Sequence, residues 1–257
     1  MKPAAALHPA EASHPIALRG QRLRVAYDGR LVFHEVDIAI PRGHLVALIG
    51  PNGSGKSSLL RVLAGVQKPA SGVVDALSRV ALIVPADAPP GDLTPTDLAG
   101  YACSVKRKWW QWSLPPHERR LIERALGRCR LEDRANEPVW RLSAGEVQRA
   151  WMAAALACSA ETLLIDEPTT HLDLRFQMEI LRTLRELAGC GLTIVMSLHD
   201  LTLAARFADS IALLAGGQLS CGAPQHILTE DSLARAFDVS VTTFPHPAQG
   251  YTICVPS

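Results

Sequence analysis

Alternation of apolar and polar residues marks the first part of the chain. Short runs at residues 23–27 and 36–40 alternate with a period of two, which is typical of strands with one buried face. The run Leu-Val-Ala-Leu-Ile at residues 45–49 is apolar throughout and predicts a strand buried on both faces. We therefore expect an antiparallel sheet that leads into a buried central strand.

Strand-like and helical segments alternate in much of the remaining chain. The predicted elements are a helix at residues 56–64, strand-like pieces within 73–84, strands at 162–165 and 192–197, and a helix at 176–188 between those two strands. Helices that connect successive strands allow the strands to lie parallel, so this order predicts a parallel sheet. The expected fold class is therefore α/β.

A charged helical region interrupts this alternation. From about residue 92 to residue 159 the pattern is helical, with an amphipathic helix at 121–131. Near the C-terminus, a hairpin around Gly216-Gly217 and a helix at 224–237 are predicted. The helical region is therefore expected to be an insertion between strands of the sheet.

The composition is typical of a soluble globular protein. The 257 residues are 48% hydrophobic and include 26 basic and 25 acidic side chains, so charge gives no general reason to expect nucleic acid as a partner. No apolar run approaches the ~18 residues that span a bilayer. Residues 1–15, rich in Ala, His and Pro, predict a disordered extension rather than a signal peptide. One domain is expected at residues 16–240, followed by a C-terminal tail at 241–257.

A glycine-rich segment after the buried strand fits the phosphate-loop pattern G-x-x-x-x-G-K-[ST] without a mismatch. It consists of Gly50, Pro51, Asn52, Gly53, Ser54, Gly55, Lys56 and Ser57, and Ser58 follows as a further expected ATP-binding residue. Glycines permit positive φ, so consecutive backbone N–H groups can turn toward phosphates. We expect Lys56 to reach the β- and γ-phosphates of ATP, and the Ser57 hydroxyl to complete a Mg²⁺ shell.

Two acidic residues end the apolar strand at 162–165. Asp166 can reach Mg²⁺, usually through water, and Glu167 can polarise the attacking water as a general base. An isolated Asp-Glu pair would be typical of an ordinary solvated strand end. Beside a phosphate loop the pair favours nucleotide hydrolysis, because phosphoryl transfer needs positioning and charge neutralisation more than covalent help.

A small polar turn opens a helix at Leu142-Ser143-Ala144-Gly145-Glu146, where backbone N–H groups can meet an anion. Together with the phosphate loop and the two acids, it resembles the signature of ATP-binding cassette (ABC) transporter ATPase subunits. That signature is usually Leu-Ser-Gly-Gly-Gln/Glu, so Ala144 replaces one glycine. The resemblance covers nearly all of residues 16–240. It implies an ABC-type P-loop NTPase with a parallel-sheet core, an antiparallel β-subdomain and a helical subdomain at about 92–159.

The resemblance implies that two copies act together. Ser143 and Gly145 would bind the γ-phosphate of the ATP held by the other subunit, and Ala144 and Glu146 belong to the same ATP-binding turn. Two copies would then close head-to-tail on two ATP–Mg²⁺, each ATP lying between Lys56 of one subunit and the signature of the other.

Three more positions match the family pattern. Tyr27, 23 residues before the phosphate loop, corresponds to an aromatic residue that stacks on adenine, with ordinary packing as the alternative. His199 matches the switch histidine that contacts the γ-phosphate. Asp173 closes the segment Thr170-His171-Leu172-Asp173, which matches the loop that touches the partner subunit, although His171 could equally be a solvated loop residue.

Several kinds of machine use this ATPase. One phosphate loop, no membrane-spanning run and no sustained heptads leave a separate ATPase subunit of a transporter or a soluble scaffold ATPase. Segments 167–173, 198–201, 227–229 and 237–239 are most similar to subunits that import iron–siderophore, haem or cobalamin. The short link before Val80 is also similar to that of zinc and manganese importers. A cassette that binds ATP and rarely hydrolyses it is the competing class.

Membership of an importer implies further partners and a location. The resemblance implies a separate integral membrane permease and, indirectly, a solute-binding protein, with this subunit peripheral at the cytoplasmic face of the inner (plasma) membrane. Basic and aromatic residues interleave at 106–112, which includes Trp109, Trp110 and Trp112. We rank docking on the membrane subunits first, packing within the insertion second and stacking on single-stranded nucleic acid third.

One position departs from the family pattern. After a strand such as residues 80–84 the family usually has Pro-Gln, and that glutamine joins Mg²⁺ and the attacking water, whereas here Pro85 is followed by Ala86 and Asp87. Alanine cannot ligate a metal, so we hypothesise that Asp87 or water fills the gap and that hydrolysis or its coupling to transport is altered.

We therefore expect Ala86→Gln to change the ATPase rate, its magnesium dependence or its coupling to transport when the permease is present. ATPase assays on the wild type and the variant check this expectation. If all three quantities are unchanged, the hypothesis is wrong.

Overall fold

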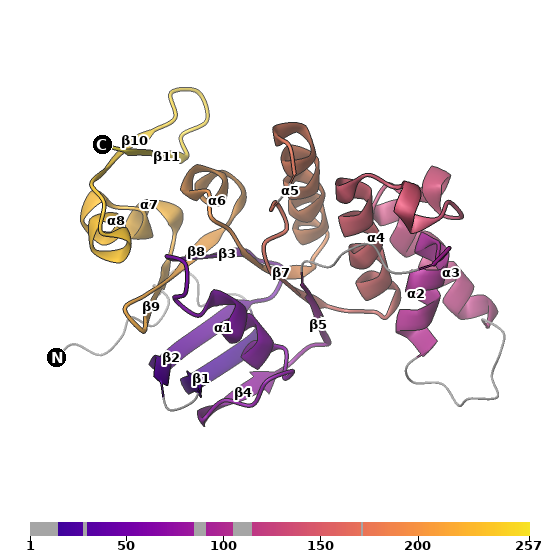
Figure 1. Ribbon diagram of the computed structural model, residues 1–257, viewed down its shortest axis with the longest axis horizontal. Coiled ribbons are helices and arrows are strands. Elements are labelled where there is room, and N and C mark those ends of the chain that lie inside the picture. The colour runs from indigo at the N-terminus through magenta and orange to yellow at the C-terminus, as the bar shows by residue number, and fades with distance from the viewer. Residues whose placement is uncertain (1–14, 28–29, 85–90, 105–114, 171) are drawn as a thin grey trace.

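A six-stranded sheet lies at the centre of the computed structural model, which describes residues 15–27, 30–84, 91–104, 115–170 and 172–257 (Figure 1). In spatial order its strands are β5 (Val80–Ile83), β6 (Thr162–Ile165), β7 (Thr193–Ser197), β3 (Leu45–Ile49), β8 (Ser210–Ala215) and β9 (Gln218–Gly222). The first five strands are parallel, and β9 pairs antiparallel with β8. The α/β class and the parallel sheet predicted from the sequence are confirmed.

The middle strands are apolar throughout because both faces of the sheet are covered. Every residue of β3, β6 and β7 is buried. Along β3, Val46 and Leu48 join one hydrophobic cluster, whereas Ala47 and Ile49 join another. Alternate side chains of one strand therefore enter two cores, one on each face of the sheet.

A three-stranded antiparallel sheet and one helix cover the first face. The elements are β2 (Arg30–Pro41), β1 (Ile16–Tyr27), β4 (Ser71–Ala76) and α1 (Lys56–Leu63). Leu23 and Phe33 from this sheet share a cluster with Leu60 of α1 and Leu48 of the central sheet. The predicted antiparallel sheet is confirmed, and its strands extend beyond the short runs in which we expected them.

Helices cover the second face. α5 (Leu174–Gly189) and α6 (Leu201–Phe207) connect β6 to β7 and β7 to β8, and their buried residues join the second cluster. Each begins at an aspartate whose carboxylate accepts a backbone hydrogen bond: Asp173 from Phe176 N at 3.0 Å and Asp200 from Leu203 N at 2.8 Å. These N-caps explain why both helices start directly after the loops that follow their strands.

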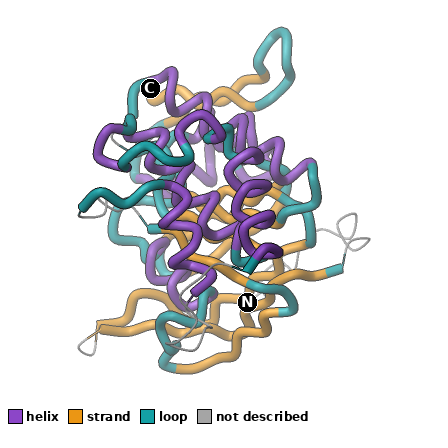
Figure 2. The backbone as a smooth tube through the Cα atoms, turned by 90° about the vertical axis from the view of Figure 1, so that its right-hand side faces the viewer, coloured by secondary structure: helices purple, strands orange, loops and turns teal. Residues whose placement is uncertain are grey.

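The helical region forms a group of its own beside the sheets. It contains α2 (Pro95–Ser104), α3 (Pro116–Arg128) and α4 (Ala144–Ala157), which lie together at the right of Figure 1 and toward the viewer in Figure 2. Pro116 stands at the first position of α3, where its fixed φ suits a helix and its missing N–H costs no hydrogen bond. In the part of the chain that the structure describes, no helix is long and apolar enough to cross a membrane.

The C-terminal part differs in detail from the sequence prediction. The hairpin around Gly216-Gly217 is present as β8–β9, but the helix expected at 224–237 is divided into α7 (Pro224–Ile227) and α8 (Glu230–Phe237). The division occurs because the Thr229 hydroxyl accepts a hydrogen bond from Ser232 N and caps a new helix.

The last segment, predicted as a tail, contains an antiparallel pair, β10 (Val241–Pro245) and β11 (Thr252–Pro256). Cys254 N donates to the Thr202 hydroxyl, so β11 is held against α6. The predicted extension up to residue 14, the Ala86–Asp87 departure, the run at 106–112 and His171 lie outside the described residues.

Candidate nucleotide-binding and hydrolysis site

The phosphate loop connects the carboxyl end of β3 to the start of α1. Gly50 and Gly55 have φ of 151° and 102°, in the region that favours glycine. A Cβ on Gly50 would collide with the carbonyl oxygen of Leu214, and one on Gly55 would press on Val32 and Phe33. Both glycines are therefore required by close packing, against backbone at Gly50 and against side chains at Gly55, as well as by the turn of the loop.

Lys56 crosses the loop at the first position of α1. Its Nζ donates to the carbonyl oxygens of Gly50 and Pro51 at 2.9 and 3.1 Å, and the residue is only 6% exposed. Burial lowers the pKa of Lys56, and the nearby carboxylates of Glu167 and Asp166 partly offset this effect. A phosphate in the loop would provide the counter-charge that this desolvated amine lacks.

The first part of the loop borders a cavity of about 440 Å³. Its lining comes from β2, the phosphate loop and the β8–β9 turn: Leu31, Val32, His34, Pro51, Asn52, Gly53, Ser54, Gly216 and Gly217. Ser54 Oγ is buried without a hydrogen-bond partner among the described residues. Because a buried hydroxyl rarely stays unpaired, this atom fits a loop that binds a polar ligand.

Asp166 lies at the carboxyl end of β6, next to the carboxyl end of β7. It is 6% exposed, and its Oδ1 accepts a 2.7 Å hydrogen bond from the hydroxyl of Ser197, the last residue of β7. The same hydroxyl accepts a 2.7 Å bond from Glu167 N. We did not predict a role for Ser197 from the sequence; the signal was a polar residue that ends an apolar strand two positions before His199.

Glu167 follows in a strained backbone conformation, with φ of 47°. Its carboxylate contacts His199 Nε2 at 2.7 Å and accepts a 2.9 Å bond from the Thr170 hydroxyl. Burial by itself raises the pKa of Glu167, but the bonds from His199 and Thr170 outweigh it, so the pKa lies below its ordinary value. The carboxylate is thus kept ionised, as a general base must be.

Tyr27 lies at the end of β1 and is 45% exposed. Its hydroxyl donates to Gln67 Oε1 at 2.7 Å and shares a 3.0 Å bond with Ser58 Oγ. The ring is therefore anchored beside α1 while keeping exposed surface on which a base could stack. Ser58, which we expected to bind ATP, uses its hydroxyl for Tyr27 in this structure.

Oxygen donors for a magnesium ion come from two of the predicted positions. Within the described ranges no group of three or more His, Cys, Asp or Glu could hold a metal ion. The Ser57 hydroxyl and the Asp166 carboxylate are the hard oxygen ligands that Mg²⁺ prefers, and a few protein ligands suffice when phosphates supply the others. The donor set therefore fits Mg²⁺ bound together with a nucleotide.

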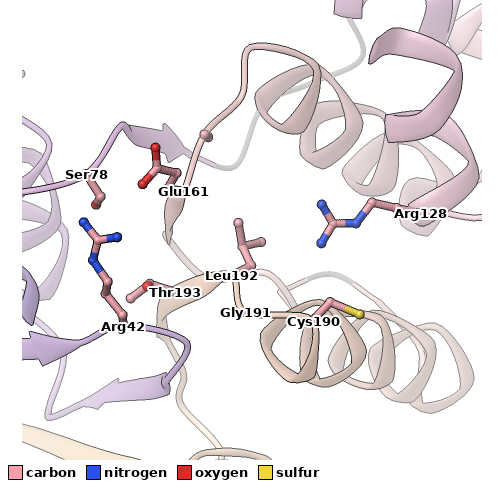
Figure 3. A pocket seen from close by; sticks show the side chains of 9 residues that line it. Arg42, Ser78, Arg128, Glu161, Cys190, Gly191, Leu192 and Thr193 are labelled. Atoms are coloured by element: carbon pink, nitrogen blue, oxygen red, sulfur yellow. The ribbon is translucent and has the colours of Figure 1, made fainter. Parts of the chain in front are cut away.

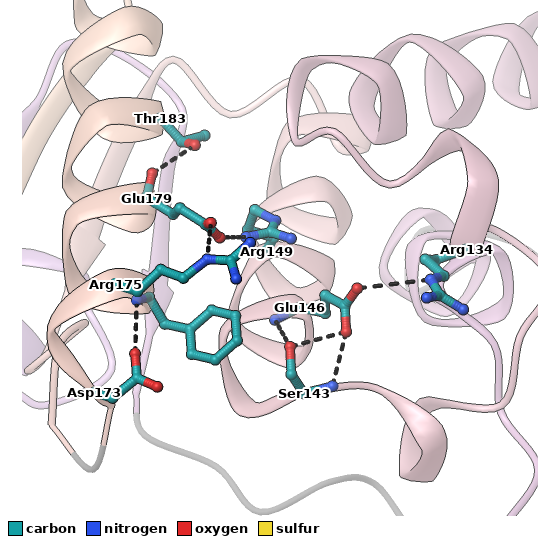
Figure 4. A network of polar contacts seen from close by, with 9 residues as sticks. Arg134, Ser143, Glu146, Arg149, Asp173, Arg175, Glu179 and Thr183 are labelled. Carbon is teal, nitrogen blue, oxygen red and sulfur yellow. Dashed lines mark hydrogen bonds and ion pairs between the residues drawn. The ribbon is translucent and has the colours of Figure 1, made fainter.

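The signature residues form the first turn of α4 (Figure 4). The Ser143 hydroxyl accepts a hydrogen bond from Glu146 N, and Glu146 Oε2 accepts bonds of 2.8 Å from both Ser143 N and Ser143 Oγ. Such a reciprocal cap stabilises a helix start by about 1 kcal/mol. The methyl group of Ala144 is exposed, so the replacement of a glycine here leaves the turn intact.

Electrostatics and packing hold this turn in place. Burial raises the pKa of Glu146, but its bonds to Ser143 and the charge of Arg134 lower it below the ordinary value. Gly145 is buried against the ring of Phe176 in the first turn of α5, where a Cβ would lie 3.2 Å from Cδ1. Since Asp173 caps α5 through Phe176 N, the signature turn packs against the first turn of the helix that Asp173 begins (Figure 4).

Ion pairs extend this contact along α4 and α5. Glu179 lies 3.5 Å from Arg149 Nη1 and 3.2 Å from Arg175 Nε (Figure 4). In Figure 1, α4 lies with the helical group, whereas α1 lies beside the antiparallel sheet. Lys56, Asp166, Glu167 and His199 are thus brought together by the central sheet, and the signature stands apart from them.

A second polar cavity lies at the opposite, amino-terminal edge of the sheet (Figure 3). It measures about 210 Å³ and is lined by Arg42, Ser78, Arg128, Ala160, Glu161, Cys190, Gly191, Leu192 and Thr193. Arg42 and Arg128 reach into it from opposite sides, and none of the predicted site residues lines it. The predicted site residues that follow β3, β6 and β7 instead lie at the carboxyl edge of the sheet, where open α/β folds generally bind their ligands.

The fold and the carboxyl-edge cluster define a P-loop ATPase. The family profile described as ABC transporter matches residues 33–170. The chain is 33% identical over 254 residues to the iron(3+)-hydroxamate import ATP-binding protein of Bacillus subtilis, covering 93% of this chain and 94% of that protein. It is 36% identical over 254 residues to the hemin import ATP-binding protein of Streptomyces coelicolor, covering 91% and 88%.

A solved structure agrees with these relatives. A metal-chelate type ABC transporter in an inward-facing conformation has a chain that superposes with a TM-score of 0.86 at 25% identity, covering 95% of this chain and 98% of that one. The protein therefore belongs to the ATP-binding proteins of the ABC transporter family, and is an ABC-type ATPase.

The contact between Thr170 and Glu167 predicts a shift in the pH dependence of ATP hydrolysis. Thr170→Val removes a hydroxyl that donates to the carboxylate, so the pKa of Glu167 should rise. The acid limb of the kcat/KM profile is then expected to move to higher pH. Thr169→Val, at the neighbouring residue, and Thr170→Ser, which keeps the hydroxyl, should retain the wild-type profile; coincident profiles for Thr170→Val and the wild type would contradict this account.

Proposed function

We propose that this protein is the ATP-binding and ATP-hydrolysing subunit of an importer that takes up a metal chelate through a separate membrane permease. One observation carries the proposal. Lys56 interacts electrostatically with Asp166 and Glu167, and His199 and Thr170 bond to the Glu167 carboxylate and hold it ionised, all at the carboxyl ends of neighbouring strands. This is the set of charges that binding and cleaving a nucleoside triphosphate requires.

ATP binding would involve three parts of the described site. The phosphate loop would wrap the phosphates with backbone N–H groups, and Lys56 would exchange its carbonyl contacts for phosphate oxygens. The exposed ring of Tyr27, anchored by Gln67 and Ser58, would stack on adenine. Ser57 and Asp166 would hold Mg²⁺, which supplies charge neutralisation at the β- and γ-phosphates.

Hydrolysis would depend on how Glu167 is held. Its carboxylate would accept a proton from the attacking water, while Thr170 and His199 fix its position. The strained backbone of Glu167 points the side chain at a defined place rather than leaving it free at a strand end. His199 is half exposed and so remains accessible to a bound γ-phosphate.

A second copy of the chain would complete each site. Because the turn formed by Ser143, Gly145 and Glu146 stands with the helical group, it is available to ATP held by another subunit. The Ser143 hydroxyl would then exchange its bond to Glu146 for one to the γ-phosphate. Because Gly145 contacts Phe176, and Phe176 N bonds to Asp173, a movement of the signature turn would also move the loop at Asp173. That loop would also face the second copy.

Transport would follow from this closure. The helical region would press on permease helices, and a solute-binding protein would deliver cargo from the other side of the membrane. The subunit would therefore sit peripherally at the cytoplasmic face of the inner membrane. The cargo class rests on relatives whose names specify import of iron(3+)-hydroxamate, hemin or cobalamin.

Two other functions are each favoured by a feature of the sequence. The short link between Gly72 and Val80 keeps a zinc or manganese importer as a second candidate. Ala86, in place of the usual glutamine, favours a slow ATPase that works as a switch or scaffold without driving transport.

An uptake experiment tests the proposal. In a strain that lacks its own copy, the wild type should restore uptake of labelled ferric hydroxamate or of hemin, and Glu167→Gln should not. Glu161→Gln, which changes a carboxylate lining the cavity at the opposite edge of the sheet, is the matched control and should behave as wild type. Uptake of zinc or manganese in place of the chelates would favour the second candidate.

A single-turnover assay separates the motor from the switch. Glu167→Gln should lower the rate of ATP cleavage by about 10²- to 10⁴-fold, the usual contribution of a positioned general base. A wild type that cleaves ATP no faster than Glu167→Gln would contradict the transporter function and favour the switch.

A further inference from the structure

Ser197 is the one hydroxyl that joins the two acidic residues of the hydrolysis site in the part of the chain that the structure describes. It is completely buried at the end of β7, and its backbone pairs in register with Leu48 of β3. The preceding residues Ile194, Val195 and Met196 are apolar and fully buried. A serine in such surroundings has to find its hydrogen-bond partners inside the protein.

Both hydrogen bonds of this hydroxyl have a defined direction. Glu167 N can only donate, so Ser197 Oγ accepts that 2.7 Å bond with a lone pair. Its proton is then available for Asp166 Oδ1, at 2.7 Å. The Ser197 side chain thereby connects the backbone of Glu167 to the carboxylate of Asp166. It also connects the end of β7 to the end of β6.

We infer that Ser197 is a positioning residue for nucleotide-bound Mg²⁺, a role that rests on the proposed function. By occupying Asp166 Oδ1, Ser197 would fix the carboxylate and leave Oδ2 for the metal or its waters. By holding Glu167 N, it helps to keep the backbone of Glu167 at positive φ. Ser197 itself would touch neither metal nor nucleotide.

The geometry also joins Ser197 to His199 in one unit. Ser197 holds the backbone of Glu167, and His199, two residues further on, holds its carboxylate at 2.7 Å. The last residue of β7 and a residue of the loop that follows it therefore hydrogen-bond to Glu167 at two different groups, its backbone N–H and its carboxylate. Residues that hydrogen-bond to a metal ligand without touching the metal typically contribute 10- to 100-fold to metal affinity or activity.

Magnesium-dependent nucleotide binding is the direct test, because it does not require turnover. In the Glu167→Gln background, which slows cleavage, a fluorescent trinitrophenyl analogue of ATP is titrated with and without Mg²⁺. Ser197→Ala should leave binding in excess chelator unchanged, because the phosphate loop is intact. In Ser197→Ala, the Mg²⁺ concentration that gives half of the metal-dependent change in fluorescence should be about 10- to 100-fold higher than in the protein that keeps Ser197.

Matched variants separate positioning from general damage to the core. Ser197→Thr keeps the hydroxyl and should restore the wild-type Mg²⁺ dependence. Ser210→Ala removes a serine hydroxyl that is 3% exposed at the start of β8, away from the acids, and should leave the Mg²⁺ dependence unchanged. If Ser197→Ala does not fold, Ser197→Cys, which has a similar size and a much weaker donor, takes its place in the comparison.

Two results would overturn the inference. One is a Ser197→Ala protein whose Mg²⁺ dependence matches that of the Ser210→Ala control. The other is an equal change in nucleotide binding with and without Mg²⁺, which would assign Ser197 to the stability of the sheet alone. Either result can arise while the wild type hydrolyses ATP and supports uptake, so failure of this inference is distinguishable from failure of the proposed function.

Discussion

The parallel register of three strands is the constraint on which the site depends. β3, β6 and β7 are hydrogen-bonded neighbours, with Leu48 opposite Ser197 and Ile165 opposite Met196. Their carboxyl ends therefore lie at one edge, where the next residues are the phosphate loop, the two acids and the segment leading to His199. Pairing of the strands therefore brings together residues that lie more than a hundred positions apart in the chain, such as Lys56 and Asp166. Both faces of these strands are buried, so a shift of one residue would exchange side chains between the two cores and disrupt the packing of both.

Rigid support at this edge allows unfavourable local states to persist. Glu167 has a left-handed backbone although proline follows it, a combination that costs on the order of 1–3 kcal/mol. Lys56 is buried, donates hydrogen bonds to two backbone carbonyl oxygens and has a pKa lowered by desolvation. The bond that Glu167 N donates to Ser197 and the bond that Thr170 donates to the carboxylate hold Glu167 in place, and a phosphate would relieve the desolvation of Lys56. The site is organised for a charged ligand, and the fully packed sheet beneath it makes that organisation possible.

Much of this could be predicted from the sequence, because the decisive signals are local. The phosphate loop, the buried strands and the acids each depend on a few consecutive residues, and the structure brings Lys56, Asp166, Glu167 and His199 together as their order along the sheet requires. Ser197 escaped prediction because its meaning depends on a neighbouring strand that lies thirty-one residues earlier in the chain. The pair β10–β11 escaped because short strands that end in proline and pack on α6 carry little pattern of their own. The break between α7 and α8 depends on a cap at Thr229 that periodicity does not reveal.

Completion of each ATP site by a second copy is the central claim, and mixing two inactive variants tests it most directly. Lys56→Ala damages the phosphate loop and Ser143→Arg damages the signature, so each protein alone should hydrolyse almost no ATP. In an equal mixture, a dimer of one copy of each has one site in which both parts are intact. Activity should therefore reappear, up to about a quarter of the wild-type rate if sites act independently and subunits pair at random. A mixture as inactive as its components, or a Ser143→Arg protein with full activity, would contradict the account.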